Sequence, residues 1–147
     1  MARPFRFTLE KILEYRRQAE DQARLALAQA QASRDRQQAM LVSLRQELEH
    51  CLHEFSTKKQ LTQGELWLWS TYRERLINDT KHAETALATL EAQVETRRHE
   101  LVAKATERKL LEKFRAKQAA HHAQREQHKE QAEFDESATL RYGRPPY

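Results

Sequence analysis

The sequence predicts an all-α fold in which two long helices form an antiparallel coiled-coil hairpin, with the second helix longer than the first and overhanging it. Glycine and proline, which separate short elements, number 2 and 3 in 147 residues, and only Gly64 lies in the interior. The chain is instead rich in Ala, Leu, Glu, Gln, Arg and Lys, which are strong helix formers. Apolar residues also recur with heptad spacing in two long stretches. Sandwiches, barrels and α/β folds need far more turns than this chain provides.

The first helix is expected over about residues 6–57. Apolar residues recur in it at positions separated by alternating steps of three and four, some of which are occupied by polar residues, and these positions define a seam able to face a partner helix. Four polar residues share this seam and argue against a zipper that is packed along its whole length: Arg16, Glu20, Arg34 and Gln37. The apolar members are Leu9, Leu13, Ala23, Leu27, Ala30, Leu41, Leu44, Leu48, Cys51 and Phe55.

A turn is expected at about residues 58–62, followed by a second helix over about 63–136. Thr62, Gln63, Gly64 and Glu65 form a capping box, in which the Thr62 hydroxyl accepts the Glu65 amide. A connection this short predicts that the helices run antiparallel. The apolar members of the second seam are Leu66, Trp69, Leu76, Ala83, Leu87, Leu90, Val94, Leu101 and Leu111, and its polar members are Arg73, Thr80, Arg97, Lys104 and Arg108.

The whole chain, residues 1–147, is expected to form this single hairpin, with a flexible tail at 137–147. The second helix should extend beyond the start of the first. Its overhang, about residues 118–136, is polar, so we expect it to bury little within one molecule and either to fray or to dock on a partner.

Charge is distributed unevenly along the chain, which has a net charge of +4. Residues 1–36 and 97–147 are basic on balance, whereas residues 37–96 are acidic, so a hairpin would carry opposite charge at its two ends. The sequence has no apolar run of membrane-spanning length and no signal peptide at its start. With one cysteine, Cys51, these features favour a cytoplasmic protein.

Catalytic, cofactor and metal sites are not predicted. Two glycines cannot build a phosphate-binding loop, and carboxylate pairs on a helical hairpin lack the burial that shifts a pKa. His50, Cys51, His53 and Glu54 suggest a metal site, but Cys51 falls on the seam, and no second cluster completes the set. A ligand role is also disfavoured for the overhang histidines, His121, His122 and His128.

Two other segments suggest binding surfaces. The basic stretch 97–109 is interrupted by Glu100 and Glu107, which favours a solvated or protein-binding face over nucleic-acid binding. Trp67, Trp69 and Tyr72 point in different directions on a helix, so a two-helix hairpin should leave at least one aromatic exposed. The alternative is that the hairpin tip folds over these side chains.

Three segments resemble the FliJ family of the bacterial flagellar type III export apparatus. The opening, residues 5–21 (FRFTLEKILEYRRQAED), resembles the start of the family's sequences. Residues 107–114 (ERKLLEKF) are similar to its basic stretch late in the second helix, and Phe134, Asp135 and Glu136 to its acidic ending. The three occur in the right order at the right chain length.

The resemblance implies a non-enzymatic, stalk-like coiled coil, similar to that of the rotary ATPase γ subunit, that needs no cofactor. Its implied partners are the hexameric flagellar export ATPase, whose assembly it would promote, the cytoplasmic linker of the export gate, and export chaperones. It would lie at the inner face of the membrane, at the flagellar base, only through these partners.

Both partner surfaces can be assigned to residues. By analogy with the γ subunit, the end that carries both termini would enter the ATPase ring, and the basic residues expected there are Arg3, Arg6, Arg16, Arg17, Arg108, Lys109, Lys113 and Arg115. The expected export-gate residues are Trp67, Trp69, Tyr72 and Leu76. Asp79 and Ala83, at further positions of that stretch, depart from the family pattern.

Three other interpretations compete with this one. The injectisome counterpart of the stalk shares the architecture and differs in the ATPase that it binds. A generic cytoplasmic coiled-coil scaffold would use the aromatic cluster for dimerisation and involve no ATPase. A nucleic-acid-binding helix is the least favoured, because of the acidic residues in the basic stretch.

Overall fold

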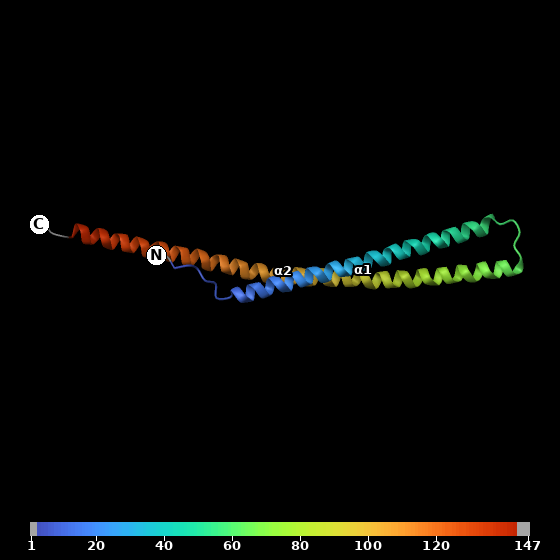
Figure 1. The fold of residues 1–147 in the computed structure, drawn as a ribbon, viewed down its shortest axis with the longest axis horizontal. Helices are drawn as coiled ribbons and strands as arrows, with labels where there is room; N and C mark the ends of the chain where they lie inside the picture. The colour runs from blue at the N-terminus through green and yellow to red at the C-terminus, as the bar shows by residue number, and fades with distance from the viewer. Residues whose placement is uncertain (1–2, 144–147) are drawn as a thin grey trace. The chain divides into compact units, whose positions relative to one another are not determined.

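The computed structural model describes residues 3–143 and contains two long helices (Figure 1). Helix α1 (Glu10–Thr57) has 48 residues, and helix α2 (Gln63–Tyr142) has 80. The two helices pack against each other, and the second is the longer, which confirms the predicted all-α fold class.

The predicted seams are the buried surfaces of the helices. On α1 the buried residues are Leu13, Glu20, Leu41 and Cys51, and on α2 they are Leu76, Thr80, Ala83 and Val94. All eight belong to the two heptad seams, because only one stripe of each helix can face the other in a two-helix arrangement. The remaining buried residue of the described chain, Phe7, lies outside both helices.

The chain divides into two compact units, and each helix contributes to both. Within the described residues, unit 1 comprises residues 3–20 and 103–143, and unit 2 comprises residues 21–102. In unit 1, Glu10 contacts Arg115 and Arg16 contacts Glu107, so the paired positions run in opposite directions along the two helices. This is the antiparallel pairing that the sequence predicts.

Unit 2 is antiparallel as well. The amide of Gln37 donates a hydrogen bond to the carbonyl oxygen of Ala83 (3.3 Å), whereas Cys51, farther along α1, lies beside Trp69 and Arg73, which are earlier in α2. Gln37 is one of the polar seam residues. Its bond across the helix pair satisfies an amide that would otherwise interrupt an apolar contact.

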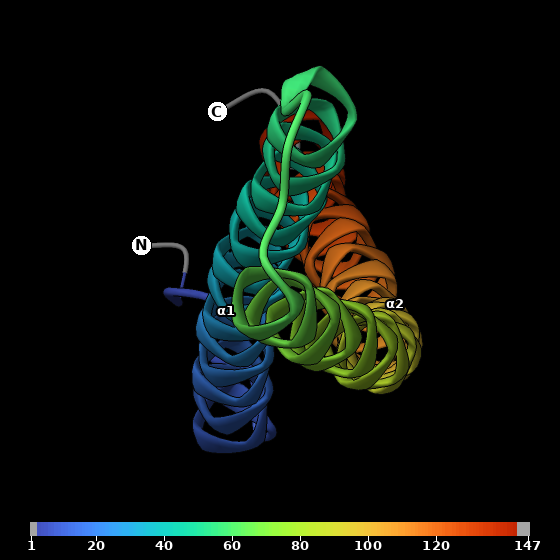
Figure 2. The same ribbon diagram turned by 90° about the vertical axis from the view of Figure 1, so that its right-hand side faces the viewer.

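The connection between the helices is seen end-on in Figure 2. Helix α1 ends at Thr57, and α2 begins at Gln63. The predicted capping bond is present, because the Glu65 amide donates to the Thr62 hydroxyl oxygen at 3.2 Å. The Lys58 ammonium lies 5.3 Å from the centre of the Trp69 ring, a cation–π contact that joins the connection to α2.

Residues 3–9, here called the N-terminal strap, are not helical and lie beside α2 (Figure 1). Helix α1 therefore begins at Glu10, later than the expected residue 6. The reason is packing: Phe7 is only 7% exposed and meets Phe114 edge to face, with 6.0 Å between ring centres. In this non-helical conformation the apolar Phe7 ring is removed from water against Phe114.

The strap also contacts α2 through His122. The His122 ring lies 5.7 Å from the Phe5 ring, and its Nε2 lies 2.9 Å from the carbonyl oxygen of Arg3. Four residues of the expected overhang are half-buried, namely Gln118, Ala119, His122 and Glu126, and the strap contacts His122 among them. The overhang is thus partly covered by the chain's own N-terminal segment, which the sequence analysis did not foresee.

Beyond Glu126 every described residue of α2 is exposed, and the helix continues to Tyr142, past the expected end at 136. Ala138, Leu140 and Arg141 are good helix formers, and Arg141 places positive charge at the negative end of the helix dipole. The Gly143 amide closes the last turn by donating to the carbonyl oxygen of Thr139 at 2.8 Å. The rest of the expected tail, residues 144–147, lies outside the described residues.

Candidate protein-binding surfaces

A network of ion pairs joins the two helices in unit 1. Its centre is Glu20, which is only 5% exposed and accepts hydrogen bonds from the Arg108 guanidinium. Arg108 also donates to Glu112 at 2.7 Å. The hydrogen bond with Glu20 raises the pKa of Arg108 above its already high value, so the guanidinium stays charged.

Three further arginines of unit 1 also pair with carboxylates on the other helix, and one of them, Arg17, shares Glu112 with Arg108. Arg16 donates to Glu107 at 2.6 Å, Arg115 donates to Glu10 at 2.9 Å, and Arg17 reaches Glu112 at 3.5 Å. Together with Arg108, four of the eight basic residues expected at the ATPase ring are therefore held by carboxylates of their own chain. Their charges stabilise the pairing of α1 with α2, and a partner would have to compete for them.

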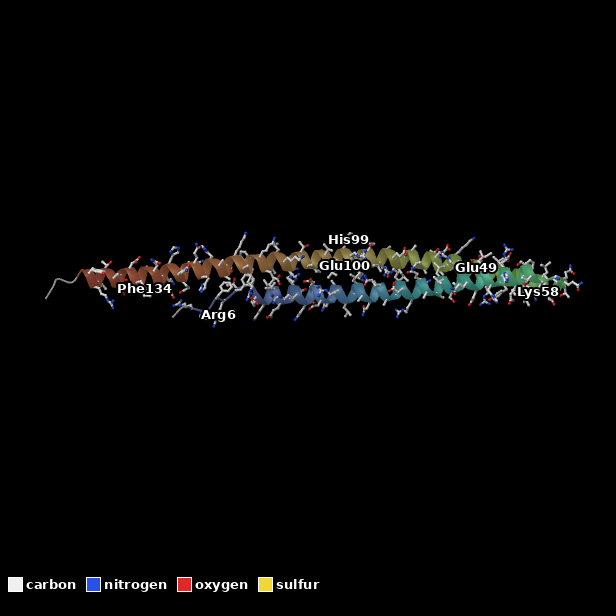
Figure 3. All side chains as sticks on the ribbon, turned by 90° about the horizontal axis from the view of Figure 1, so that it is seen from above. Arg6, Glu49, Lys58, His99, Glu100 and Phe134 are labelled. Atoms are coloured by element: carbon white, nitrogen blue, oxygen red, sulfur yellow. The ribbon has the colours of Figure 1, made fainter. Side chains whose placement is uncertain are left out.

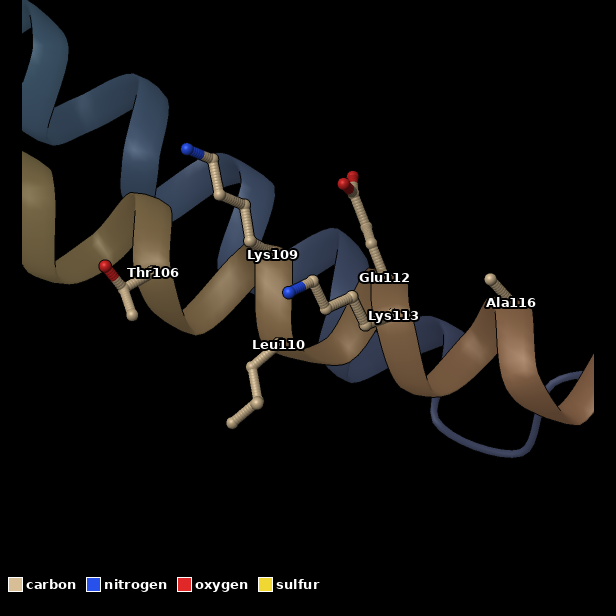
Figure 4. Close-up of a pocket in the computed structure, with 6 residues that line it drawn as sticks. All are labelled: Thr106, Lys109, Leu110, Glu112, Lys113 and Ala116. Carbon is tan, nitrogen blue, oxygen red and sulfur yellow. The ribbon is translucent and has the colours of Figure 1, made fainter.

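The other four basic residues, Arg3, Arg6, Lys109 and Lys113, are exposed, and the structure gives their side chains no ion pair within residues 3–143. Figure 3 labels Arg6 on the strap. Lys109 and Lys113 line a shallow groove of about 530 Å³ along α2, together with Leu110, which is 70% exposed. In Figure 4, Leu110 projects away from the ribbon of α1. This groove combines free positive charge with an exposed apolar side chain.

A second surface lies at the start of α2 in unit 2. Trp67 and Leu68 are 69% and 63% exposed, which confirms that the hairpin leaves a large aromatic uncovered. Trp69 is half-buried, and its ring meets Tyr72 edge to face, with 6.4 Å between centres. Leu68, Trp69 and Tyr72 line a hollow without polar walls. Leu76, the fourth expected gate residue, is only 4% exposed and faces the interior of unit 2.

A comparison with models of protein families matches residues 5–146 to the model described as the flagellar FliJ protein. The chain belongs to the FliJ family. Neither curated proteins nor solved structures give a significant match. The predicted family is thus confirmed, and membership makes the chain a non-catalytic component of the flagellar export apparatus.

In the histidine and cysteine cluster near the end of α1, His50 and Cys51 contact other groups of this FliJ-family chain. His50 lies 3.1 Å from Glu54, and Cys51 is buried on the seam, where burial raises the pKa of its thiol. No three potential ligands from His, Cys, Asp and Glu gather around a common point in the described part of the chain. Nor does either helix, as described, contain a stretch with the length and apolar character needed to cross a membrane.

The sequence analysis missed the strap as an element that shapes the basic surface. Phe5 and Phe7 were included in the family resemblance, but their spacing of two residues was not used. Alternation of this kind suits an extended segment that places both rings on one side. The spacing of Phe5 and Phe7 was therefore the sequence feature that could have predicted a helix start after residue 7.

Proposed function

We propose that this FliJ-family chain is a stalk-like cytoplasmic component that binds the hexameric flagellar export ATPase and promotes assembly of its ring. In the same proposal it links the ring to the cytoplasmic linker of the export gate and interacts with export chaperones. Family membership supports the first part, as do the exposed positions of Lys109 and Lys113, for which no ion pair is present among residues 3–143. The exposed aromatic surface of unit 2 supports the second.

The groove around Lys109 and Lys113 carries the proposal for ring binding. These lysines are exposed and can meet acidic side chains of the ATPase without breaking an ion pair in their own chain. Leu110 between them adds apolar area that a partner can cover. The arginines Arg16, Arg17, Arg108 and Arg115 would then act mainly by keeping α1 against α2.

Measurements of ATP hydrolysis and ring formation by the cognate export ATPase, at concentrations where its rings are scarce, test this proposal. The wild-type chain should stimulate both. The double variant K109E/K113E should lose most of the stimulation while melting at the wild-type temperature, because both side chains are exposed. A matched control, K59E/K81E, makes the same charge change in unit 2 and should stimulate normally. Equal stimulation by K109E/K113E and wild type would exclude the groove.

For the export gate we propose contact through Trp67, Trp69 and Tyr72. Large aromatic side chains in partly exposed positions are frequent hot spots of protein interfaces. Trp67 is 69% exposed, and Leu68, Trp69 and Tyr72 line an apolar hollow beside it. Leu76 can support this surface from beneath, since it is buried at the following turn of α2.

Binding to the isolated cytoplasmic linker of the gate, measured by titration calorimetry, tests the assignment. W67A and Y72A should each weaken binding by about tenfold or more, in the range of hot-spot residues, without loss of helicity. V102A removes a side chain that is also exposed, on another part of α2, and should bind normally. If W67A and Y72A bind as tightly as wild type, another face contacts the gate.

A further inference from the structure

One face of α2 in unit 1 carries a heptad pattern that no described contact uses. Its residues, here called the α2 stripe, are separated by alternating steps of four and three: Lys109, Lys113, Ala116, Ala120, Ala123, Gln127, Glu130 and Phe134. All eight are exposed. The three alanines and Phe134 make part of this face apolar, and the regular spacing would let a second helix follow it.

The stripe is separate from the contacts within unit 1. The residues of α2 that face α1 include Arg108 and Leu111, and the strap lies against Phe114 and His122. None of these belongs to the stripe. Figure 3 shows Phe134, which is 74% exposed, on a part of α2 that has no second helix beside it. A helix could therefore dock on the stripe without displacing α1 or the strap.

The order of residues in the stripe is self-complementary. If two copies of α2 run antiparallel, with a two-fold axis between His121 and His122, Lys113 of each copy lies opposite Glu130 of the other. In the same arrangement Lys109 lies opposite Phe134, Ala116 opposite Gln127, and Ala120 opposite Ala123. Every pairing occurs twice, and no charge of the stripe faces a like charge.

The side chains suit these pairings chemically. The Lys109 stem can cover the Phe134 ring while its ammonium stays in water, and the alanines near the two-fold axis allow the two backbones to approach closely. Lys113 and Glu130 are about 25 Å apart along one helix, so they cannot meet within a chain. Among residues 3–143 neither of them has an ion-pair partner.

We propose that the protein forms a homodimer in which the α2 stripes of two copies pack antiparallel. The charge complementarity favours a second copy over another acidic partner, because the stripe itself contains the acid that its lysine needs. Lys109 and Lys113 also belong to the proposed ring-binding groove, so dimerisation and ring binding would exclude each other. The dimer does not depend on the proposed ring binding, because it is inferred from the α2 stripe and is tested without the ATPase.

Sedimentation velocity of the full chain over a range of concentrations tests the dimer. Wild type should dimerise, and more strongly at low ionic strength, where charge pairs are less screened. The single variants K113E and E130K each place like charges opposite one another twice, and each should weaken the dimer by about tenfold. K117E makes the same charge change at an exposed position off the stripe and should dimerise as wild type does.

Two complementation experiments make the test specific. The double variant K113E/E130K restores opposite charges at both sites and should dimerise about as well as wild type. An equimolar mixture of the two single variants should form mixed dimers, since one copy then supplies two acids and the other two lysines. A wild-type chain that stays monomeric at all accessible concentrations would overturn the proposal, and so would a double variant as weak as the singles.

Discussion

Glu20 and Arg108 show how a polar residue can occupy a coiled-coil seam. Each is one of the polar members of its seam, and the two meet across the helix pair. A carboxylate as buried as that of Glu20 loses most of its hydration, and a charge-assisted hydrogen bond offsets the loss. Arg16, another polar residue of the α1 seam, pairs with Glu107 of α2 in a more exposed position, and both pairs favour the same antiparallel alignment of α1 with α2.

Substitutions at this pair should therefore be strongly non-additive. R108L removes two hydrogen bonds from a buried carboxylate and should lower the melting temperature by several degrees. The double variant E20L/R108L places two apolar side chains on the seam and should melt higher than R108L, near or above wild type. K109L, one position away and exposed, serves as the control and should melt near wild type. Circular dichroism melts would contradict this account if E20L/R108L melted lower than R108L.

At the scale of elements, the helix seams could be predicted from the sequence. Packing of one helix against the other buries residues with heptad spacing, and this spacing is visible in the sequence. All eight buried helix residues lie at positions with this spacing. The strap could not be predicted in this way, since its position depends on single contacts of Phe7 with Phe114 and of His122 with the Arg3 carbonyl. Single contacts between residues far apart in the chain produce no repeating pattern in the sequence.

The same distinction applies to the candidate surfaces. Sequence alone indicated basic residues near both termini and aromatics early in the second helix. It could not separate Arg108, which pairs with Glu20 of its own chain, from Lys109, which has no ion pair among residues 3–143. Nor could it show that Leu76 is covered whereas Trp67 is not. Whether these residues are buried, paired or exposed depends on which face of each helix packs against the other, and on which residues of α2 lie opposite the acidic residues of α1.

The strap should protect part of α2 from local opening. F7A removes the buried ring that packs on Phe114, and we expect faster amide hydrogen exchange over about residues 114–126, where the strap lies. R6A changes an exposed neighbour in the strap and should leave exchange there unchanged. Exchange near Val94, in unit 2, should be the same in both variants. Unaltered exchange over 114–126 in F7A would show that the strap contributes no protection.

At the scale of the whole molecule, the division into two compact units suggests that they can open separately. Unit 2 is held by apolar seam residues such as Leu41, Leu76 and Val94, whereas the centre of unit 1 contains the ion pair of Glu20 with Arg108. Cys51 is a natural probe of unit 2, because it is the chain's only cysteine and is buried there. Burial also raises the pKa of its thiol and so lowers the fraction of reactive thiolate near neutral pH.

Alkylation of Cys51 should therefore be slow in the folded protein and should respond to substitutions in its own unit. L76A removes a side chain that is 4% exposed in unit 2 and should cost about 2–5 kcal/mol, which corresponds to an alkylation rate about 30-fold higher or more if labelling occurs through opening. R108L, in unit 1, should change the rate far less, even where it lowers the melting temperature. All variants should react alike in denaturant, where the thiol is exposed and its pKa returns to the ordinary value. Equal acceleration of alkylation by L76A and R108L would mean that the two units open together. Units 1 and 2 would then not have separate free energies of opening.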